Sequence, residues 1–276
     1  MRPRGALRYA YDAIGLLIFV VMIFPIYWMV STALKPGKEI LSLDPVWFPS
    51  PITFDNFISA MQVPFFWNDV VNSLTVVLTV VAISTVVSFL AAVAVARFGF
   101  RGRTAFIVMV IGVQMVPLNA LVIPIYLLLD SVNQVDSLLG VIAYYMAVVL
   151  PFMVWTLRGF VHNIPTDLEE AAMVDGASRV GAYIRIIFPL VAPGLVATAI
   201  FGFIQAWNEY IIAYVLLSSS SKQTLTIWLA SFTTQHGTDW GGLMAGATLT
   251  SLPVVVFFLL VQRRVAGGLT AGAVKG

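Results

Sequence analysis

The side chains that could carry out chemistry are few and far apart in this sequence. There are two histidines, His162 and His236, and no cysteine, so no spacing typical of a metal site occurs. The paired carboxylates Glu169 and Glu170 are adjacent and would point to different parts of a helix surface. Neither a phosphate-binding G-x-x-x-x-G-K-[ST] loop nor a G-x-S-x-G nucleophile motif is present. The sequence therefore predicts no catalytic site, no metal and no cofactor in this chain.

Composition indicates a membrane protein. The chain has 276 residues, of which 60% are hydrophobic and 10% charged, and its mean hydropathy is +0.95. Soluble domains are about 25% charged. A lipid bilayer is the solvent that tolerates so much apolar surface. The net charge of +2 is too small to indicate a nucleic-acid partner. The positions of the few charges are therefore more informative than their sum.

Six stretches without charge are long enough to cross a bilayer as helices, at about 20 residues per crossing. They are residues 13–34, 70–96, 104–129, 137–157, 186–208 and 240–262. Pro189 and Pro193 predict that the fifth helix starts late, so we expect it to continue past Glu209 to about Leu217. The predicted fold is all-α: a polytopic membrane protein with six transmembrane helices in a single domain, residues 1–276.

Lysine and arginine predict the orientation, because they concentrate in cytoplasmic loops. Six crossings place both termini on one side with loops 97–103 and 158–185, and this side carries 12 of the 15 basic residues. The other side has Lys35, Lys38 and Lys222. Both termini are therefore predicted to be cytoplasmic. The amino end resembles a secretory signal, but its apolar run is long and lacks a small-residue cleavage site, which predicts an uncleaved first helix.

The same topology makes the loops of about 35–69 and 218–239 external. The first contains five prolines, which predict that no long helix forms there. The second is polar at both ends with an apolar centre. That pattern is typical of a re-entrant hairpin, an interfacial helix or a surface for an extracellular partner.

Three polar residues in the predicted spans are candidates to line a solute pathway: Asn119, Asn208 and Glu209. A carboxylate that faced lipid would cost several kcal/mol, which makes Glu209 a functional candidate. The alternative is that Glu209 lies near the outer end of its helix, where water or Asn208 satisfies it. Amides such as Asn119 more often hold helices together than bind solute. A proton-driven carrier usually needs more buried acids or histidines than these.

A charged stretch interrupts the apolar sequence at residues 168–189, LEEAAMVDGASRVGAYIRIIFP. Thr166 and Glu169 match a capping box, which predicts a helix that starts near Asp167. Gly176 is suited to end this helix, and Ser178 to cap a second one. The predicted helix–turn–helix either rests on the lipid surface or docks on a protein. Its acidic residues would be repelled by an anionic leaflet, which favours a protein partner.

The same stretch resembles a known motif. The order E-A-A-x-x-x-G-x9-I-x-x-P is met by Glu170, Ala171, Ala172, Gly176, Ile186 and Pro189. It resembles the EAA loop of the membrane subunits of bacterial ATP-binding-cassette (ABC) importers, which usually have leucine where this chain has Phe188. The chain also resembles one branch of this family, the carbohydrate permeases similar to the smaller maltose-transporter membrane subunit. This further resemblance lies in the segments QMVPLNALVIPIYLL (114–128), AWNEY (206–210) and GGLTAGAVKG (267–276).

This resemblance implies a type I ABC importer permease fold in the bacterial plasma membrane. It implies that the EAA loop, about 163–189, couples to a separate ATPase subunit dimer through Glu170, Ala171, Ala172, Asp175 and Gly176. The cytoplasmic tail 263–276 would be a second ATPase contact. ATP and Mg²⁺ would be bound by the ATPase and not by this chain. The other implied partners are a second homologous permease subunit, an extracellular or periplasmic solute-binding protein and a sugar.

The solute implied by the resemblance is a sugar or oligosaccharide, with glycerol phosphate or another polyol as the alternative. No predicted span has an arginine in its interior, which favours a neutral sugar over a phosphorylated solute. A secondary carrier is the alternative of a different class, and it would show uptake without any ATPase.

Overall fold

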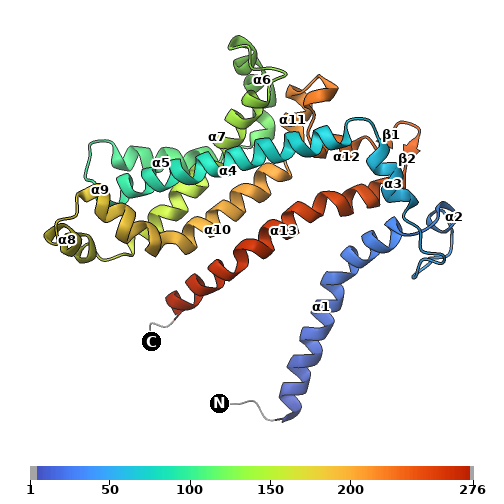
Figure 1. The fold of residues 1–276 in the computed structure, drawn as a ribbon, viewed down its shortest axis with the longest axis horizontal. Coiled ribbons are helices and arrows are strands. Elements are labelled where there is room, and N and C mark those ends of the chain that lie inside the picture. The colour runs from blue at the N-terminus through green and yellow to red at the C-terminus, as the bar shows by residue number, and fades with distance from the viewer. Residues whose placement is uncertain (1–4, 274–276) are drawn as a thin grey trace. The chain divides into compact units, whose positions relative to one another are not determined.

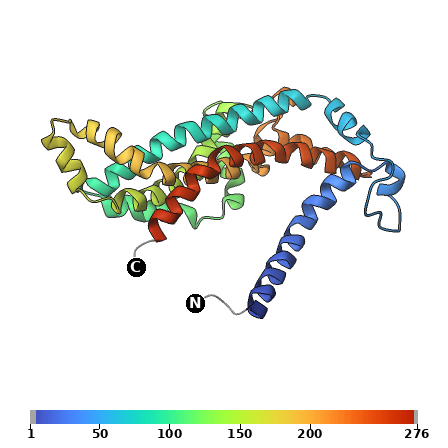
Figure 2. The ribbon, with the colours of Figure 1, turned by 60° about the horizontal axis from the view of Figure 1, so that its bottom comes forward.

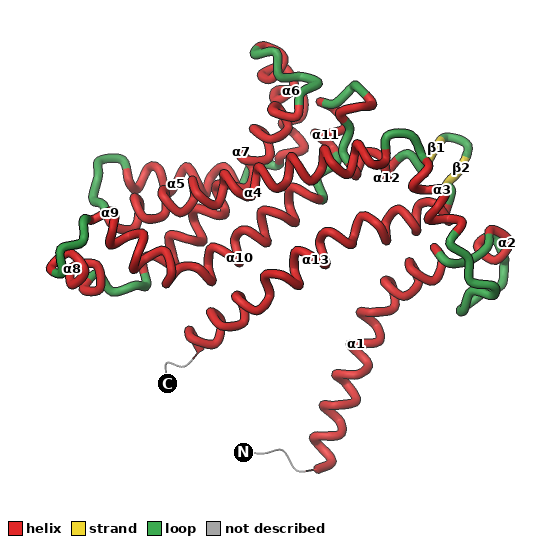
Figure 3. Tube along the Cα trace, in the orientation of Figure 1, coloured by secondary structure: helices red, strands yellow, loops and turns green. Residues whose placement is uncertain are grey.

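The computed structural model describes residues 5–273, and the side chains of residues 5–8, 118–119 and 263–273 lie outside the described part. Helices make up nearly all of the described chain (Figure 3). The chain forms two compact units, one of residues 1–67 with 228–252 and one of residues 68–227 with 253–276. Each unit is described by itself.

The first unit contains the amino-terminal helix α1 (Gly5–Ala33) and the segments after it, α2 (Gly37–Ile40) and α3 (Asp55–Gln62) (Figure 1). The Asn56 amide donates to the carbonyls of Ala33 and Lys35 at 2.9 and 2.8 Å, which satisfies the end of α1. The end of α12, a small hairpin and the start of α13 complete the unit. Their bounds are α12 (Leu225–Ala230), β1 (Thr233–Thr234), β2 (Gly237–Thr238) and α13 (Trp240–Ala273).

The second unit is a helix bundle in which α7 packs against α10 and α5 packs against α7. Its long helices are α4 (Phe66–Arg97), α5 (Arg103–Gln114), α7 (Leu138–His162) and α10 (Phe188–Trp207). Its short elements are α6 (Val122–Ser131), α8 (Asp167–Val174), α9 (Arg179–Ala182), α11 (Ile211–Leu216) and the 3-10 helix η3 (Ser220–Lys222). Figures 1 and 2 show α8 and α9 together beyond one end of the bundle.

Five of the described helices are long and apolar enough to cross a membrane: Tyr9–Ala33, Phe66–Arg97, Leu138–His162, Arg179–Trp207 and Trp240–Gln262. They correspond to five of the six predicted spans. The predicted third span, 104–129, is not one helix, because α5 ends at Gln114 and α6 begins at Val122 after the 3-10 helix η1 (Leu118–Leu121). Pro117 lies at the break and has no N–H to continue an α-helix. The prediction of a continuous third helix is therefore wrong.

The fifth span also differs from its prediction. Its helix starts before the prolines and runs through α9, a π-helical turn η2 (Tyr183–Ile187) and α10. The Phe188 N–H donates to the Tyr183 carbonyl, five residues back. This wider turn carries the helix past Pro189, whose missing N–H would interrupt an ordinary turn. The helix ends at Trp207, so the predicted continuation is interrupted before the separate helix α11.

The two predicted external loops contain only short elements. As predicted, residues 35–65 form no long helix, only α2 and α3. Residues 218–239 contain η3, α12 and the hairpin, in which Thr233 pairs with Thr238 and Thr234 with Gly237. Among the described residues this hairpin is the one exception to an all-α fold.

A set of hydrogen bonds, which we name the Asp136 latch, joins two loops of the second unit. The Asp136 carboxylate accepts from the backbone N–H groups of Ser218 (3.0 Å) and Ser219 (2.9 Å), from the Ser219 hydroxyl (2.6 Å) and from the Lys222 ammonium (3.0 Å). The Ser219 hydroxyl, its N–H and the Lys222 ammonium hold the pKa of Asp136 well below its ordinary value. The latch therefore fixes the segment that follows α11.

Candidate functional site

The first candidate element is built on the short helix α8. It begins at Asp167, as predicted, but the capping box does not form: Thr166 has a helical backbone (φ −65°, ψ −26°) and its side chain makes no capping hydrogen bond. The Glu169 N–H instead donates to the Thr166 carbonyl at 2.9 Å. The helix therefore starts at the predicted residue without the predicted side-chain cap, and the Glu169 carboxylate is free to point elsewhere.

The turn after α8 forms as predicted. Gly176 has a φ of +89°, a left-handed conformation that favours glycine. The Gly176 N–H donates to the Met173 carbonyl (3.1 Å), and the Ala177 N–H to the Ala172 carbonyl (2.9 Å), which is the pattern of a Schellman motif. The Ser178 hydroxyl then accepts from the Gly181 N–H at 3.1 Å and caps α9. Backbone bonds therefore fix the orientation of α8 on the helix that follows it.

A buried ion pair fixes α8 from its inner side. Arg97, the last residue of α4, pairs with the Glu169 carboxylate and also donates to the Ile164 carbonyl at 2.8 Å. The side chains of Arg97 and Glu169 are only 7% and 8% exposed. Sequence reasoning assigned Glu169 to a capping box and not to an ion pair, and no spacing rule joins residues 72 positions apart. The pair links the long apolar helix α4 directly to the short helix α8.

The outer face of α8 is open and partly apolar. Glu170, Ala171 and Asp175 are exposed, Gly176 is exposed at the turn, and Ala172 is half-buried. Val174 is 88% exposed, although a solvated helix has no need of an apolar side chain there. Four of the five predicted coupling residues therefore lie on one accessible surface. Val174 extends this surface, and sequence reasoning missed it because the E-A-A-x-x-x-G motif leaves its position unspecified.

A hydrophobic cluster packs the helix that follows α8 and α9 against the bundle. It joins α4, α7, η2 and α10 through Phe89, Ala92, Val93, Leu157, Val161, Ile187, Val191 and Leu195. Ile187 is fully buried in this cluster, and Tyr183 packs against its edge. Packed side chains therefore connect η2, which follows α9 in the chain, to three long helices.

The second candidate group surrounds Glu209, between α10 and α11. The Tyr145 hydroxyl donates to its carboxylate at 2.8 Å, and the N–H groups of Ile212 (2.8 Å) and Ala213 (3.1 Å) donate to the same carboxylate. Glu209 thereby caps α11. One alternative predicted that Asn208 satisfies the Glu209 carboxylate. It does not, because the Asn208 amide donates to the Ile204 carbonyl of its own helix at 2.8 Å.

Asn208 and Glu209 also line one cavity of about 240 Å³, together with Tyr144, Tyr145, Val148, Gln205 and Ala206. The exposed amides of Asn208 and Gln205 and the carboxylate of Glu209 supply hydrogen-bonding groups beside two tyrosines. Asn119 lies in η1, but its side chain is outside the described part, as are the side chains of the predicted tail contact 263–276. The structure therefore brings together two of the three predicted pathway residues.

Comparison with known proteins decides the family. Residues 84–270 match the model of the binding-protein-dependent transport system inner membrane component. The chain belongs to this family. This inner membrane component is 45% identical over 262 residues, 95% of both chains, to the diacetylchitobiose uptake system permease protein of Streptomyces coelicolor. It is 36% identical over 275 residues, 99% of this chain and 100% of the other, to the trehalose transport system permease protein of Mycobacterium tuberculosis.

Solved structures agree on the fold of this inner membrane component. A chain of a bacterial ABC transporter involved in the import of the acidic polysaccharide alginate matches with a TM-score of 0.81 and 22% identity, over 95% of this chain and 98% of the other. A structure of a bacterial alginate ABC transporter, in complex with an alginate pentasaccharide-bound periplasmic protein, matches with a TM-score of 0.68. The resemblance to the membrane subunits of ABC importers is confirmed, and the chain is a multi-pass inner-membrane protein.

Proposed function

We propose that this inner membrane component is the permease subunit of an ABC importer for a neutral sugar or oligosaccharide. It pairs with a second, homologous permease subunit to form the pathway, receives solute from an extracytoplasmic binding protein, and couples to a separate ATPase dimer. The uptake systems named for the relatives carry diacetylchitobiose and trehalose, which are uncharged sugars, and this supports the solute class.

The proposed topology has six crossings with both termini in the cytoplasm. Five crossings are the long apolar helices, and the third is made by α5, η1 and α6, which together run over residues 103–131. A broken helix is tolerated at membrane depth where neighbouring protein or water satisfies the freed backbone groups. The charge asymmetry of 12 basic residues against three supports this orientation.

The observation that carries the coupling role is the two-sided construction of α8. Its inner side is held by the buried Arg97–Glu169 pair, whereas its outer side exposes Glu170, Ala171 and Val174. A helix resting on lipid would not place a carboxylate between small apolar residues on its open face. Small side chains let a helix enter a groove, and Glu170 can pair with a basic group of the ATPase.

The role of this chain in the mechanism is to transmit movement. ATP-driven closure of the ATPase dimer moves α8, and the Arg97–Glu169 pair and the hydrophobic cluster pass this movement to α4, α7 and α10. Rigid-body movement of the helices then alternates access to the central pathway. ATP and Mg²⁺ belong to the ATPase, and the tail 263–276 is a second contact with it.

Asn208 and Glu209 are proposed to line the pathway in this movement. Asn208 is exposed in the 240 Å³ cavity, and its loss leaves the cap of α11 intact, because Glu209 makes that cap. We expect Asn208→Ala to raise the half-saturation concentration for sugar uptake with no loss of the folded subunit. An unchanged half-saturation concentration would remove Asn208 from the pathway.

The experiment that tests the function is uptake in a strain that lacks this chain, restored by the chain on a plasmid. Labelled trehalose and diacetylchitobiose are offered, and unlabelled sugars and glycerol phosphate compete. We expect uptake that stops when the ATPase is inactivated and that neutral sugars inhibit. Uptake that continues without the ATPase would instead identify a secondary carrier, and inhibition only by glycerol phosphate would change the solute class.

A further inference from the structure

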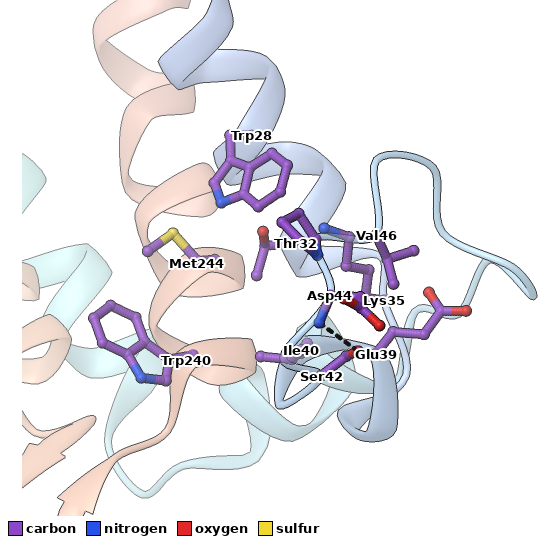
Figure 4. A pocket seen from close by; sticks show the side chains of 11 residues that line it. Trp28, Thr32, Lys35, Glu39, Ile40, Ser42, Asp44, Val46, Trp240 and Met244 are labelled. Carbon is purple, nitrogen blue, oxygen red and sulfur yellow. Dashed lines mark hydrogen bonds between the residues drawn. The ribbon is translucent and has the colours of Figure 1, made fainter.

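A further cavity lies within the first unit and has a volume of about 420 Å³, within the range of small-molecule sites. It lies between the end of α1, the segment that follows it and the start of α13 (Figure 4). The residues that give it chemical character are Trp28, Thr32, Lys35, Glu39, Asp44 and Trp240. We name it the Lys35 pocket.

Two polar side chains line the Lys35 pocket without a hydrogen-bond partner among the described residues. Lys35 is 2% exposed, and its ammonium lies over the ring of Trp28 at 4.1 Å, with no hydrogen bond or ion pair in the described residues. Thr32 is 8% exposed and its hydroxyl has no partner among the described residues. Burial lowers the pKa of Lys35, and the charge of Glu39 opposes this. Unpartnered buried donors are costly, so a ligand that accepts from both would be bound with a gain in free energy.

Trp28 of the Lys35 pocket is held in place by neighbouring aromatic side chains. Trp28 packs edge-on against Trp47 at 5.7 Å between ring centroids and also contacts Phe24. Trp240 is 49% exposed and faces the pocket from α13. Rigid aromatic faces beside hydrogen-bonding groups suit a ligand that has both C–H faces and hydroxyl groups.

The charges of the Lys35 pocket select against an anion. Glu39 and Asp44 supply two carboxylates against the one ammonium of Lys35. A polyanion would be repelled by this excess of negative charge. An uncharged sugar instead accepts hydrogen bonds from the ammonium of Lys35 and the hydroxyl of Thr32, and donates hydroxyl protons to the carboxylates.

From these observations we propose that the Lys35 pocket is a carbohydrate-binding subsite that takes a neutral mono- or disaccharide unit at the outer end of α1. The inference rests on the proposed function, since the loop that forms the pocket is external in the proposed topology. The subsite is separate from the cavity at Glu209, with which it shares no lining residue. Solute released by the binding protein would contact it before the pathway.

The test uses the complete importer in lipid nanodiscs without its binding protein, with trehalose and diacetylchitobiose as probes. Saturation-transfer NMR reports whether each sugar binds and gives its dissociation constant. Lys35→Met and Thr32→Val remove the two unpartnered donors. Lys38→Met removes an exposed lysine three positions away and is the matched control. We expect Lys35→Met to weaken sugar binding about tenfold, Thr32→Val to weaken it less, and Lys38→Met to leave it unchanged.

Three results would overturn the proposal. Absence of a sugar signal in the unaltered importer, or equal binding by the Lys35→Met and Lys38→Met variants, would overturn the proposal. If Lys35→Met instead weakens only the docking of sugar-free binding protein, then a carboxylate of that protein occupies the pocket, and the sugar subsite is wrong. Thr32→Val keeps the charge and nearly the shape of the site. It therefore tests the proposal even if Lys35→Met fails to fold. ATPase-dependent uptake, measured separately, distinguishes failure of this inference from failure of the proposed function.

Discussion

Arg97 ends the long apolar helix α4 and forms a buried ion pair with Glu169 of the short helix α8, while the next residue, Glu170, is exposed. Two neighbouring carboxylates therefore have different roles. Glu169 holds α8 to the membrane helices, and Glu170 belongs to the surface that we propose for the ATPase. A movement imposed on the outer face of α8 then reaches α4 through a direct side-chain link.

Loss of one partner of this pair should destabilise the chain and uncouple it. Glu169→Gln leaves the Arg97 guanidinium buried without its counter-charge, at a cost of about 3–5 kcal/mol, whereas Arg97→Met combined with Glu169→Met leaves no buried charge. We expect the single variant to unfold at a lower temperature and to import less sugar per ATP, and the double variant to recover the unfolding temperature. Arg101→Met, at an exposed arginine of the adjoining loop, is the control. Equal stability of the single and double variants would contradict the role of the pair.

The turn at Gly176 should tolerate asparagine far better than valine. A β-branched residue at a φ of +89° is strained by about 1–2 kcal/mol or more, whereas asparagine adopts left-handed backbone readily. We expect Gly176→Val to hydrolyse ATP without matching uptake, with membrane insertion intact, and Gly176→Asn to keep most of the uptake. Uptake and ATP hydrolysis are measured together in proteoliposomes. Normal uptake by Gly176→Val would count strongly against a coupling role for the turn.

Charge reversal at Glu170 should weaken the contact with the ATPase. Glu170→Lys places a cation opposite the basic group that we expect on the ATPase, and the two charges repel each other. Less ATPase should therefore be recovered when the complex is purified through this chain. Asp130→Lys makes the same change at an exposed carboxylate that the proposed topology puts on the external side. Recovery of ATPase in the usual stoichiometry from the Glu170→Lys variant would exclude this contact.

The five long apolar helices are predictable from the sequence, because apolar length is a property of single segments. The bounds of α8, the glycine turn and the Ser178 cap also depend on local chemistry, and all three are found where they are predicted. The EAA motif likewise marks exposed residues from local sequence alone, Glu170 and Ala171 of α8 and Gly176 at the turn after it.

Two of the wrong predictions concern proline. Pro117 does break its helix, although prolines inside spans are often accommodated, whereas Pro189 does not, because the preceding π-helical turn avoids the missing hydrogen bond. Proline gives opposite results at these two positions because the conformation of the neighbouring backbone decides whether the helix continues. The Arg97–Glu169 pair and the Tyr145–Glu209 hydrogen bond join residues 72 and 64 positions apart, and only the tertiary structure brings them together.

The Asp136 latch should hold at every physiological pH. The pKa of Asp136 lies below its ordinary value of 3.8, so the stabilisation is complete above that value and is lost only as the pH falls through the lowered pKa. We expect the amides of Ser218 and Ser219 to keep their hydrogen-exchange protection between about pH 5 and 8, after correction for intrinsic rates, and to lose it in Asp136→Ala. Asp130→Ala is the control. Protection that falls between pH 7 and 5 would contradict this account of the latch.

The most direct measurement of the central claim is the accessibility of the outer face of α8 in the assembled importer. The chain contains no cysteine, so Ala171→Cys creates a single reactive thiol, and Leu43→Cys marks the proposed external side. A membrane-impermeant maleimide is added to right-side-out and inside-out vesicles, with and without the ATPase subunits. The expected result is labelling of Ala171→Cys only from the cytoplasmic side and only when the ATPase is absent, with Leu43→Cys labelled only from outside. Labelling of Ala171→Cys from the external side, or equal labelling with the ATPase bound, would contradict the docking of α8 on the ATPase.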